Sequence, residues 1–202
     1  MATVTATRSE LLARRSRERI AQRGHAVLTR KRAALIAELR RVGLEVGDRR
    51  AELEQAAATA RRALGQAMVA DGPQAVGSAA IAASREVSAE VTSRSVAGVQ
   101  VIGLDADRVA RARTGRGYAL LASTATIDRT AEAFETELDA LLELAAAELN
   151  LRRLTLEVAR VTRQVNALEQ VVIPRLAAEQ RYIAATLEQR ALEDRVRISR
   201  RA

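Results

Sequence analysis

The stretch from Val158 to Leu187, VARVTRQVNALEQVVIPRLAAEQRYIAATL, decides the fold. Its apolar side chains recur every three or four residues, the spacing of one face of an α-helix. The pattern continues backward through Leu149 and Ala145 to Ile127, so about 70 residues predict one helix, roughly 100 Å long at 1.5 Å per residue. Such a helix cannot form a compact globule and must pair with another helix. The expected seam positions in this half of the chain are Leu138, Val158, Val161, Val165, Leu168, Val172, Ile183 and Leu187.

Residues 9 to 70 form a second long segment with the same period. Gly43 and Gly47 lie inside it, where they either bend the helix or let a partner helix approach closely. Asp71, Gly72 and Pro73 then end the helix, because proline cannot continue it. The expected seam positions of this segment are Leu28, Leu35, Val42, Val46 and Leu53.

Between the two segments the spacing of apolar residues changes from every three or four residues, typical of a helix, to every second residue, typical of a strand. Alternation in residues 87–92 and 99–102, on either side of a turn over 95–98, predicts a short β-hairpin. An isolated hairpin is marginally stable in water, so this one should pack on a helix or a partner. Residues 105–117 are expected to form a loop, and the last helix should begin between Tyr118 and Thr126.

The predicted fold class is therefore all-α: a long antiparallel two-helix coiled coil of the N- and C-terminal segments, with a small central region that contains the hairpin. We expect an N-terminal helix over 9–71, a central region over 72–117 and a C-terminal helix over 118–198. Pro174 interrupts the last helix. Continuation of the apolar pattern beyond it favours a continuous, kinked helix over two separate helices.

The composition agrees with long helices and also indicates where in the cell the protein lies. Aromatic residues make up 1% of the chain and charged residues 29%, and Ala, Leu, Val and Ile supply most of the apolar content. The chain has no cysteine, which excludes disulfides and thiolate metal sites. No apolar run is long enough to span a membrane or to act as a signal peptide. These features predict a cytoplasmic protein, held at a membrane only through partners.

The net charge of +8 is concentrated in residues 1–50, which hold thirteen Lys and Arg against five Asp and Glu. This basic segment is either a solvated helix face in an arginine-rich protein or a surface for an acidic partner, for nucleic acid or for an anionic membrane face. Candidate contact residues on it are Arg14, Arg15, Arg17, Arg19, Arg30, Lys31 and Arg32.

Catalytic and cofactor chemistry finds no support in the sequence. Gly115, Arg116 and Gly117 lack the lysine and the preceding strand of a phosphate-binding loop. His25 is the only histidine and is expected to be exposed, so no histidine pair can hold a metal. The acidic residues over 132–139 are expected to form a solvated helix face. We expect no cofactor and no metal.

Three stretches resemble the D subunit of the V-type and A-type rotary ATPases. The run from Val165 to Leu176, VNALEQVVIPRL, followed by Tyr182, Ile183, Leu187 and Glu188, closely resembles the C-terminal signature of that family. Residues 28–35, LTRKRAAL, are similar to its basic N-terminal helix, and residues 96–99, VAGV, to the turn of its hairpin. The chain lacks the lysine-rich C-terminal tail of some relatives.

The resemblance implies a non-catalytic rotor subunit of the central stalk. The paired terminal helices would enter the headpiece of A and B subunits, and the opposite end would bind the F subunit of the central stalk and the funnel-shaped subunit above the membrane ring. The basic residues would then face acidic rings in the headpiece, and Val96, Gly98 and Val99 are candidate contacts of the hairpin.

Other classes of protein share parts of this pattern. A basic coiled-coil protein that binds nucleic acid would use the same arginines, with an affinity that falls steeply with salt. The scarcity of aromatic residues and the neutral remainder of the chain argue against it. A rotor subunit of an F-type ATP synthase has a much larger domain between its helices, and a homodimeric coiled-coil scaffold would need no hairpin.

Overall fold

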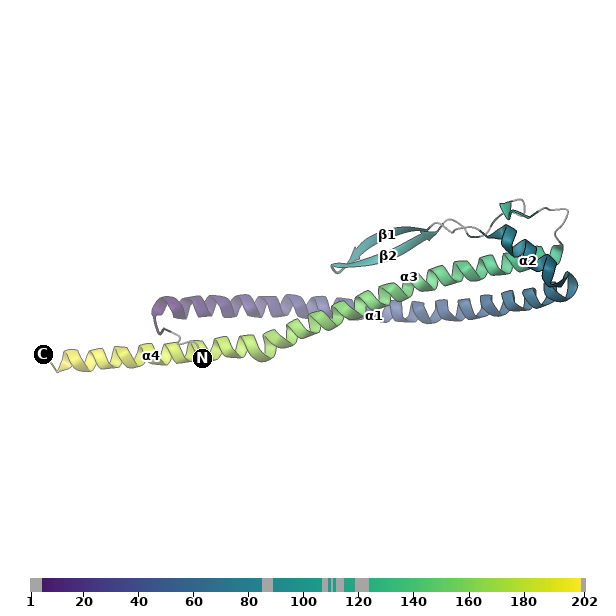
Figure 1. The fold of residues 1–202 in the computed structure, drawn as a ribbon. Coiled ribbons are helices and arrows are strands. Elements are labelled where there is room, and N and C mark those ends of the chain that lie inside the picture. The colour runs from purple at the N-terminus through teal and green to yellow at the C-terminus, as the bar shows by residue number, and fades with distance from the viewer. Residues whose placement is uncertain are drawn as a thin grey trace. The chain divides into compact units, whose positions relative to one another are not determined.

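The computed structural model describes residues 5–84, 89–106, 109, 111, 115–118 and 124–200, and within 89–106 it leaves out the side chains of 89–90 and 104–106. The elements follow the order α1 (Arg8–Ala70), α2 (Gly72–Ala83), β1 (Ala89–Val96), β2 (Val99–Ala106), α3 (Ala125–Ala167), η2 (Leu168–Val172) and α4 (Ile173–Ser199). Figure 1 shows this order along the ribbon. The chain divides into two compact units, and each is described by itself.

Unit 1 combines Met1–Ile36 with Glu157–Ala202, so it brings the two ends of the sequence together. Its helices are the first part of α1, the end of α3, the π-helical turn η2 and α4. Arg14 pairs with Glu179, and Lys31 pairs with Glu157. The later residue of α1, Lys31, pairs with the earlier residue of the other helix, Glu157, so the helices run antiparallel.

Unit 2 covers Ala37–Leu156 and holds the rest of α1, α2, the hairpin and most of α3. Here too the long helices run antiparallel, because Arg50 pairs with Glu148 while Asp71 accepts a hydrogen bond from Thr124. The predicted fold class is thus confirmed: each unit pairs the two long helices antiparallel, and unit 2 contains the central hairpin. The hairpin and the short helix α2 add a third layer to unit 2.

Threonine caps begin both long helices. The backbone N–H of Glu10 donates to Thr7 Oγ1 at 3.2 Å, and the N–H of Ile127 donates to Thr124 Oγ1 at 3.3 Å. A threonine in this position satisfies an amide that the first helical turn leaves free. The cap at Thr124 places the start of α3 at Ala125, within the range expected from the sequence.

The hairpin pairs β1 with β2 in antiparallel register, from Ala89 opposite Ala106 to Val96 opposite Val99. The turn consists of Ala97 and Gly98 alone, with φ angles of 51° and 81°. The strands therefore reach further toward the turn than the sequence pattern indicated. Positive φ at both central residues is the geometry that matches the twist of the strands. The expected strand residues Val87 and Ser88 lie outside the described residues.

The backward extension of the apolar face was wrong in detail. Leu149 is 46% exposed and Ala145 is exposed, whereas Leu144, Ala147 and Leu154 are buried. This part of α3 carries Ala and Leu all around its axis, so composition does not mark one face. The buried face follows the alternation of threes and fours back from Val161, through Leu154, and repeated steps of four drift away from it.

Candidate partner-binding surfaces

The seam of unit 1 is a narrow line of aliphatic side chains. Leu35, Val165 and Ile183 are 0% exposed and Val161 is 1% exposed. The remaining predicted seam residues of this unit, apart from Val172, are partly buried: Leu28, Val158, Leu168 and Leu187. Burial of these side chains supplies the main favourable term for pairing the two helices.

Val172 departs from this line because of the π-helical turn η2. The N–H of Ile173 donates to the carbonyl of Leu168, five residues back, so the turn holds one residue more than an α-helical turn. The extra residue shifts the heptad phase by one position. Val172 is consequently 37% exposed, and so is Tyr182, at 61%, which an uninterrupted heptad repeat from Val165 and Leu168 would place at the seam. Ile183, predicted at the seam, is fully buried.

The same turn accommodates Pro174. Proline has no N–H to donate, and its ring collides with the carbonyl four residues earlier in a regular α-helix. The wide turn ends at Val172, two residues before Pro174, and α4 continues beyond the proline to Ser199. Helix continuity through Pro174, expected from the apolar pattern, is confirmed. A π-helical turn inside a long helix often marks a functional position.

Charged side chains flank the seam of unit 1. Arg14 pairs with both Glu10 and Glu179, and Lys31 pairs with Glu157 at 2.7 Å. His25, expected to be exposed, has 29% side-chain exposure, and its Nε2 lies 3.6 Å from Glu169 Oε2 beside the π-helical turn. Arg14 and Lys31, two of the candidate contact residues, thus bind the partner helix of their own unit.

Other candidate basic residues face outward. Arg15, Arg17, Arg19 and Arg30 are exposed, and Arg32 is partly buried. The Nε atoms of Arg19 and Arg30 donate to carbonyls of their own helix, which leaves the rest of each guanidinium available. The structure therefore divides the predicted basic surface into residues within the coiled coil and residues that can meet another molecule.

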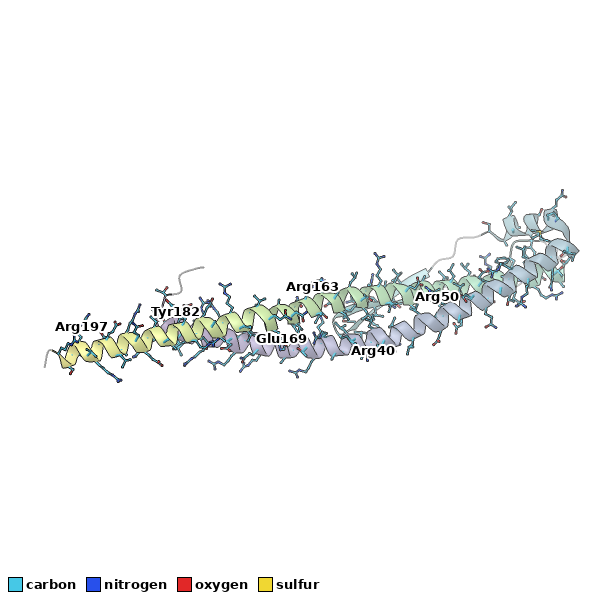
Figure 2. All side chains as sticks on the ribbon, turned by 90° about the horizontal axis from the view of Figure 1, so that it is seen from below. Arg40, Arg50, Arg163, Glu169, Tyr182 and Arg197 are labelled. Carbon is cyan, nitrogen blue, oxygen red and sulfur yellow. The ribbon has the colours of Figure 1, made fainter. Side chains whose placement is uncertain are left out.

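Unit 1 also exposes many large apolar side chains. On α1 these are Leu12, Ile20 and Val27, which are 58–65% exposed and lie seven or eight residues apart on one face. On α4 they include Tyr182, Leu192 and Val196. In Figure 2 the side chains of Tyr182 and Arg197 project away from the α4 ribbon. These side chains are available for contact with another molecule.

The seam of unit 2 contains many alanines beside larger aliphatic side chains. Val42 and Val46 are buried, as predicted, and Leu53 and Leu138 are partly buried. Ala57, Ala60 and Ala67 of α1 and Leu144, Ala147 and Leu154 of α3 are buried as well. A Cβ added to Gly43 would lie 3.9 Å from Leu151, in ordinary contact, and one added to Gly47 would meet nothing within 4 Å. These two glycines are thus not required by a close helix approach.

The hairpin is held on α3 by two polar side chains that sequence reasoning missed. Asn150, 8% exposed, accepts a hydrogen bond from the N–H of Ile102 and donates one to its carbonyl, both at 2.7 Å. Arg153 donates to the carbonyl of Gln100 at 3.2 Å. An asparagine within an apolar repeat was the available signal, since a buried amide needs partners.

The predicted hairpin contacts are placed differently from one another. Val99 is 8% exposed, Val96 is partly buried and Gly98 is exposed. Of the three, Gly98 at the turn is the one most open to another molecule. Val99 and Val101 instead belong to the buried face of the hairpin.

A buried ionic cluster in unit 2 connects α3 with α2 and with the loop residues Arg111 and Arg116. Arg116, 4% exposed, donates to Glu135 through Nε at 3.0 Å and Nη2 at 2.8 Å. The N–H of Arg111 donates to the same carboxylate, and Arg111 Nη1 donates to the carbonyl of Ala83 at the end of α2. Glu135 therefore ties α3 to the loop and, through Arg111, to α2. The expectation that this carboxylate is solvated was wrong.

Tyr118 completes the cluster. Its hydroxyl donates to Asp128 Oδ1 at 2.8 Å. Burial, together with this hydrogen bond, raises the pKa of Tyr118, and the hydrogen bond to Glu135 raises the pKa of Arg116. Beside the cluster lies a largely apolar cavity of about 410 Å³ between α1, α2 and α3, lined among others by Leu64, Val76 and Phe134.

Catalytic centres are not evident in the part of the chain that the structure describes. Within it, no group of three or more His, Cys, Asp or Glu residues could hold a metal ion. Within the same residues no helix is long and apolar enough to cross a bilayer. The side chains that stand out instead position helices or lie exposed.

These features define a helical coiled-coil protein whose notable surfaces suit contact with other macromolecules. A family model described as the D subunit of ATP synthase matches residues 10–200. The chain belongs to this family.

Relatives agree over nearly the whole length. The V-type ATP synthase D subunit of Anaeromyxobacter sp. strain Fw109-5 is 39% identical, over 96% of this chain and 90% of its own. The V-type ATP synthase D subunit of Thermus thermophilus is 39% identical, over 99% and 88%. The A-type ATP synthase D subunit of Thermococcus gammatolerans is 34% identical, over 98% and 92%. The resemblance found in the sequence is thus confirmed.

Proposed function

We propose that this chain is the non-catalytic rotor subunit in the central stalk of a V/A-type ATPase or ATP synthase. Family membership supports the coarser assignment, a component of such a complex. The rotor role would carry torque between a headpiece of A and B subunits and an ion-translocating membrane ring. The chain would be cytoplasmic and peripheral to the membrane.

One observation supports this role most: unit 1 pairs the two ends of the chain as an antiparallel coiled coil and leaves apolar and basic side chains exposed on it. Two helices joined along an apolar seam resist twisting better than one helix. The exposed aliphatic residues and arginines would meet the inner surface of the headpiece. Shallow contacts of this kind let a rotor pass successive stator positions.

Unit 2 would face the other partners, the F subunit of the central stalk and the funnel-shaped subunit above the ring. The ionic cluster at Glu135 and the hydrogen bonds that Asn150 makes to the hairpin hold the surface of unit 2 in one arrangement. Enzyme activity would belong to the assembled complex.

Charge reversal tests the headpiece contact. Arg15, Arg17 and Arg19 are changed together to Glu, with Arg61, Arg62 and Arg129 of unit 2 changed to Glu as a control of equal net charge. We expect the first variant to reduce co-purification with A and B subunits at least tenfold, more so at low salt, because its attraction becomes repulsion. Equal effects of both variants would contradict the assigned contact.

A reversible crosslink tests the rotor role itself. The chain has no cysteine, so Arg15→Cys creates a unique thiol on an exposed position of unit 1. A disulfide from this thiol to a cysteine introduced in a B subunit should stop ATP turnover, and its reduction should restore it. Unchanged turnover in the crosslinked complex would overturn the proposal. Salt-sensitive binding of nucleic acid with no recovery of A and B subunits would favour the alternative, a basic nucleic-acid-binding or scaffold protein.

A further inference from the structure

The two edges of the hairpin differ in their contacts with the rest of unit 2, since side chains of α3 bond the outer backbone groups of β2. The N–H and carbonyl of Ile102 on β2 are both bonded to the side-chain amide of Asn150, and the carbonyl of Gln100 accepts from Arg153. Asn150 thus supplies the donor and acceptor that a neighbouring strand would supply. Figure 1 shows β2 on the α3 side of the hairpin and β1 on the side away from it.

The pairing register determines which backbone groups of β1 point outward. In an antiparallel ladder, opposite residues alternate between pairs that exchange hydrogen bonds and pairs that do not. The N–H and carbonyl of Ile102 are bonded to Asn150, so Ile102 and the opposite residue, Ser93, exchange no backbone hydrogen bonds with each other. Ser93 therefore directs its own N–H and carbonyl away from β2, and Val91 and Ser95 do the same two residues on either side.

These outward groups meet no partner among the described residues. None of the hydrogen bonds found for these residues reaches the outer backbone groups of Val91, Ser93 or Ser95, and all three residues are exposed, Val91 at 64%. An open strand edge is a template for pairing with another chain, and proteins usually cover or shorten it. Asn150 and Arg153 cover the edge of β2, whereas no described residue covers that of β1.

The charge beside this edge indicates the chemistry of what would cover it. Arg94 lies between Ser93 and Ser95 and is exposed, and it forms no hydrogen bond or ion pair with any described residue. Glu38 is already bonded to Arg41 at 2.7 and 3.0 Å, and the pKa of Glu38 is lowered mainly by this hydrogen bond and to a smaller extent by the charge of Arg94. A strand that paired with β1 would place a side chain next to Arg94, where a carboxylate would neutralise it.

We propose that the free edge of β1 accepts an extended, acid-bearing segment of another subunit of the complex, which adds a third strand to the hairpin. Backbone hydrogen bonds to Val91, Ser93 and Ser95 would supply affinity, and an ion pair with Arg94 would select the partner. The inference rests on the proposed function, because it takes the partner from the same complex.

Residue-resolved hydrogen exchange tests this pairing, since strand addition protects alternate amides. In the isolated chain the amides of Val91, Ser93 and Ser95 should exchange quickly, and those of Thr92, Arg94 and Val96 more slowly. In the assembled complex the first set should slow at least tenfold. Fast exchange at these three amides in a complex that turns over ATP would overturn the inference alone, and failure of the chain to assemble would overturn the proposed function with it.

Two variants at one position separate backbone from side-chain binding. Ser93→Pro removes an N–H that the hairpin does not use, and Ser93→Ala keeps it. We expect the proline variant to lose at least tenfold in affinity for the partner and the alanine variant less than twofold. Slow exchange of the Arg94 amide would verify that the hairpin of the proline variant persists, and equal affinities of such variants would overturn the proposal.

The charge and the occupant are tested separately. Arg94→Gln should weaken the interaction several-fold, with a smaller difference at high salt. An unchanged affinity would overturn the inference that the partner segment carries an acidic residue beside Arg94. Protection of the same alternate amides in the isolated chain, rising with its concentration, would show that β1 pairs with a second copy and would overturn the assigned occupant.

Discussion

Unit 1 and unit 2 use the same pair of long helices in different ways. In unit 1 the helices have only each other, and branched aliphatic side chains form a thin seam between them. In unit 2 the seam is rich in alanine, and the hairpin, α2 and a buried ionic cluster supply further contacts. The difference teaches that unit 1 relies on the seam between two helices, whereas unit 2 adds polar connections to an apolar seam of its own.

Removal of the central carboxylate of unit 2 should have the largest effect. Glu135→Ala removes the nearer of the two carboxylates that pair with buried Arg116 and leaves the one of Asp128, 3.9 Å away, which costs about 4 kcal/mol in comparable buried pairs. Denaturant unfolding combined with hydrogen exchange should locate the loss in unit 2. Glu132→Ala, an exposed position one turn earlier on α3, serves as control and should change stability by less than about 0.5 kcal/mol. Similar losses in both variants would remove the distinction between the units.

Two neighbouring residues of α4 test the seam of unit 1. Ile183→Ala should cost about 3 kcal/mol, because the side chain is fully buried, whereas Tyr182→Ala should cost little in the isolated chain. Thermal unfolding of both variants gives the comparison. The reverse order would show that the heptad phase is not shifted at the π-helical turn. Tyr182→Ala should still weaken assembly if its exposed ring meets a partner.

These two sites also show how far the sequence alone could lead. Helical periodicity predicted the fold class, the pairing of the chain ends and most seam positions, since burial of an apolar face follows directly from spacing. It placed Val172 at the seam, because a heptad count has no means of including the extra residue of a π-helical turn. It treated Glu135 as solvated, because its partner Arg116 comes from a loop whose path no periodic pattern encodes.

The loop beside that cluster depends on one glycine. Gly117 has a φ of +86°, and a Cβ there would overlap the carbonyl oxygen of Ala82. Gly117→Ala should therefore cost about 2 kcal/mol, measured by chemical denaturation. Gly115→Ala is the matched control, since its Cβ would meet nothing within 4 Å. A loss at Gly115 as large as that at Gly117 would contradict the described path of the loop.

The smallest expected effect is a gain in the hairpin turn. Ala97 has a φ of 51°, a conformation that costs a residue with a Cβ about 1 kcal/mol and costs glycine almost nothing. Ala97→Gly should slow exchange of the hairpin amides about fivefold. Gly98→Ala, with the opposite change at a φ of 81°, should speed it. Faster exchange in the Ala97→Gly variant would show that the turn is not limited by this strain.

Rotation of the chain within the assembled complex tests the account most directly. Arg61→Cys places a single label on an exposed position of α1, in a chain with no other cysteine. During ATP hydrolysis by the immobilised headpiece, a probe on this thiol should turn stepwise in one direction. A probe that stays fixed while the headpiece continues to hydrolyse ATP would contradict the rotor role.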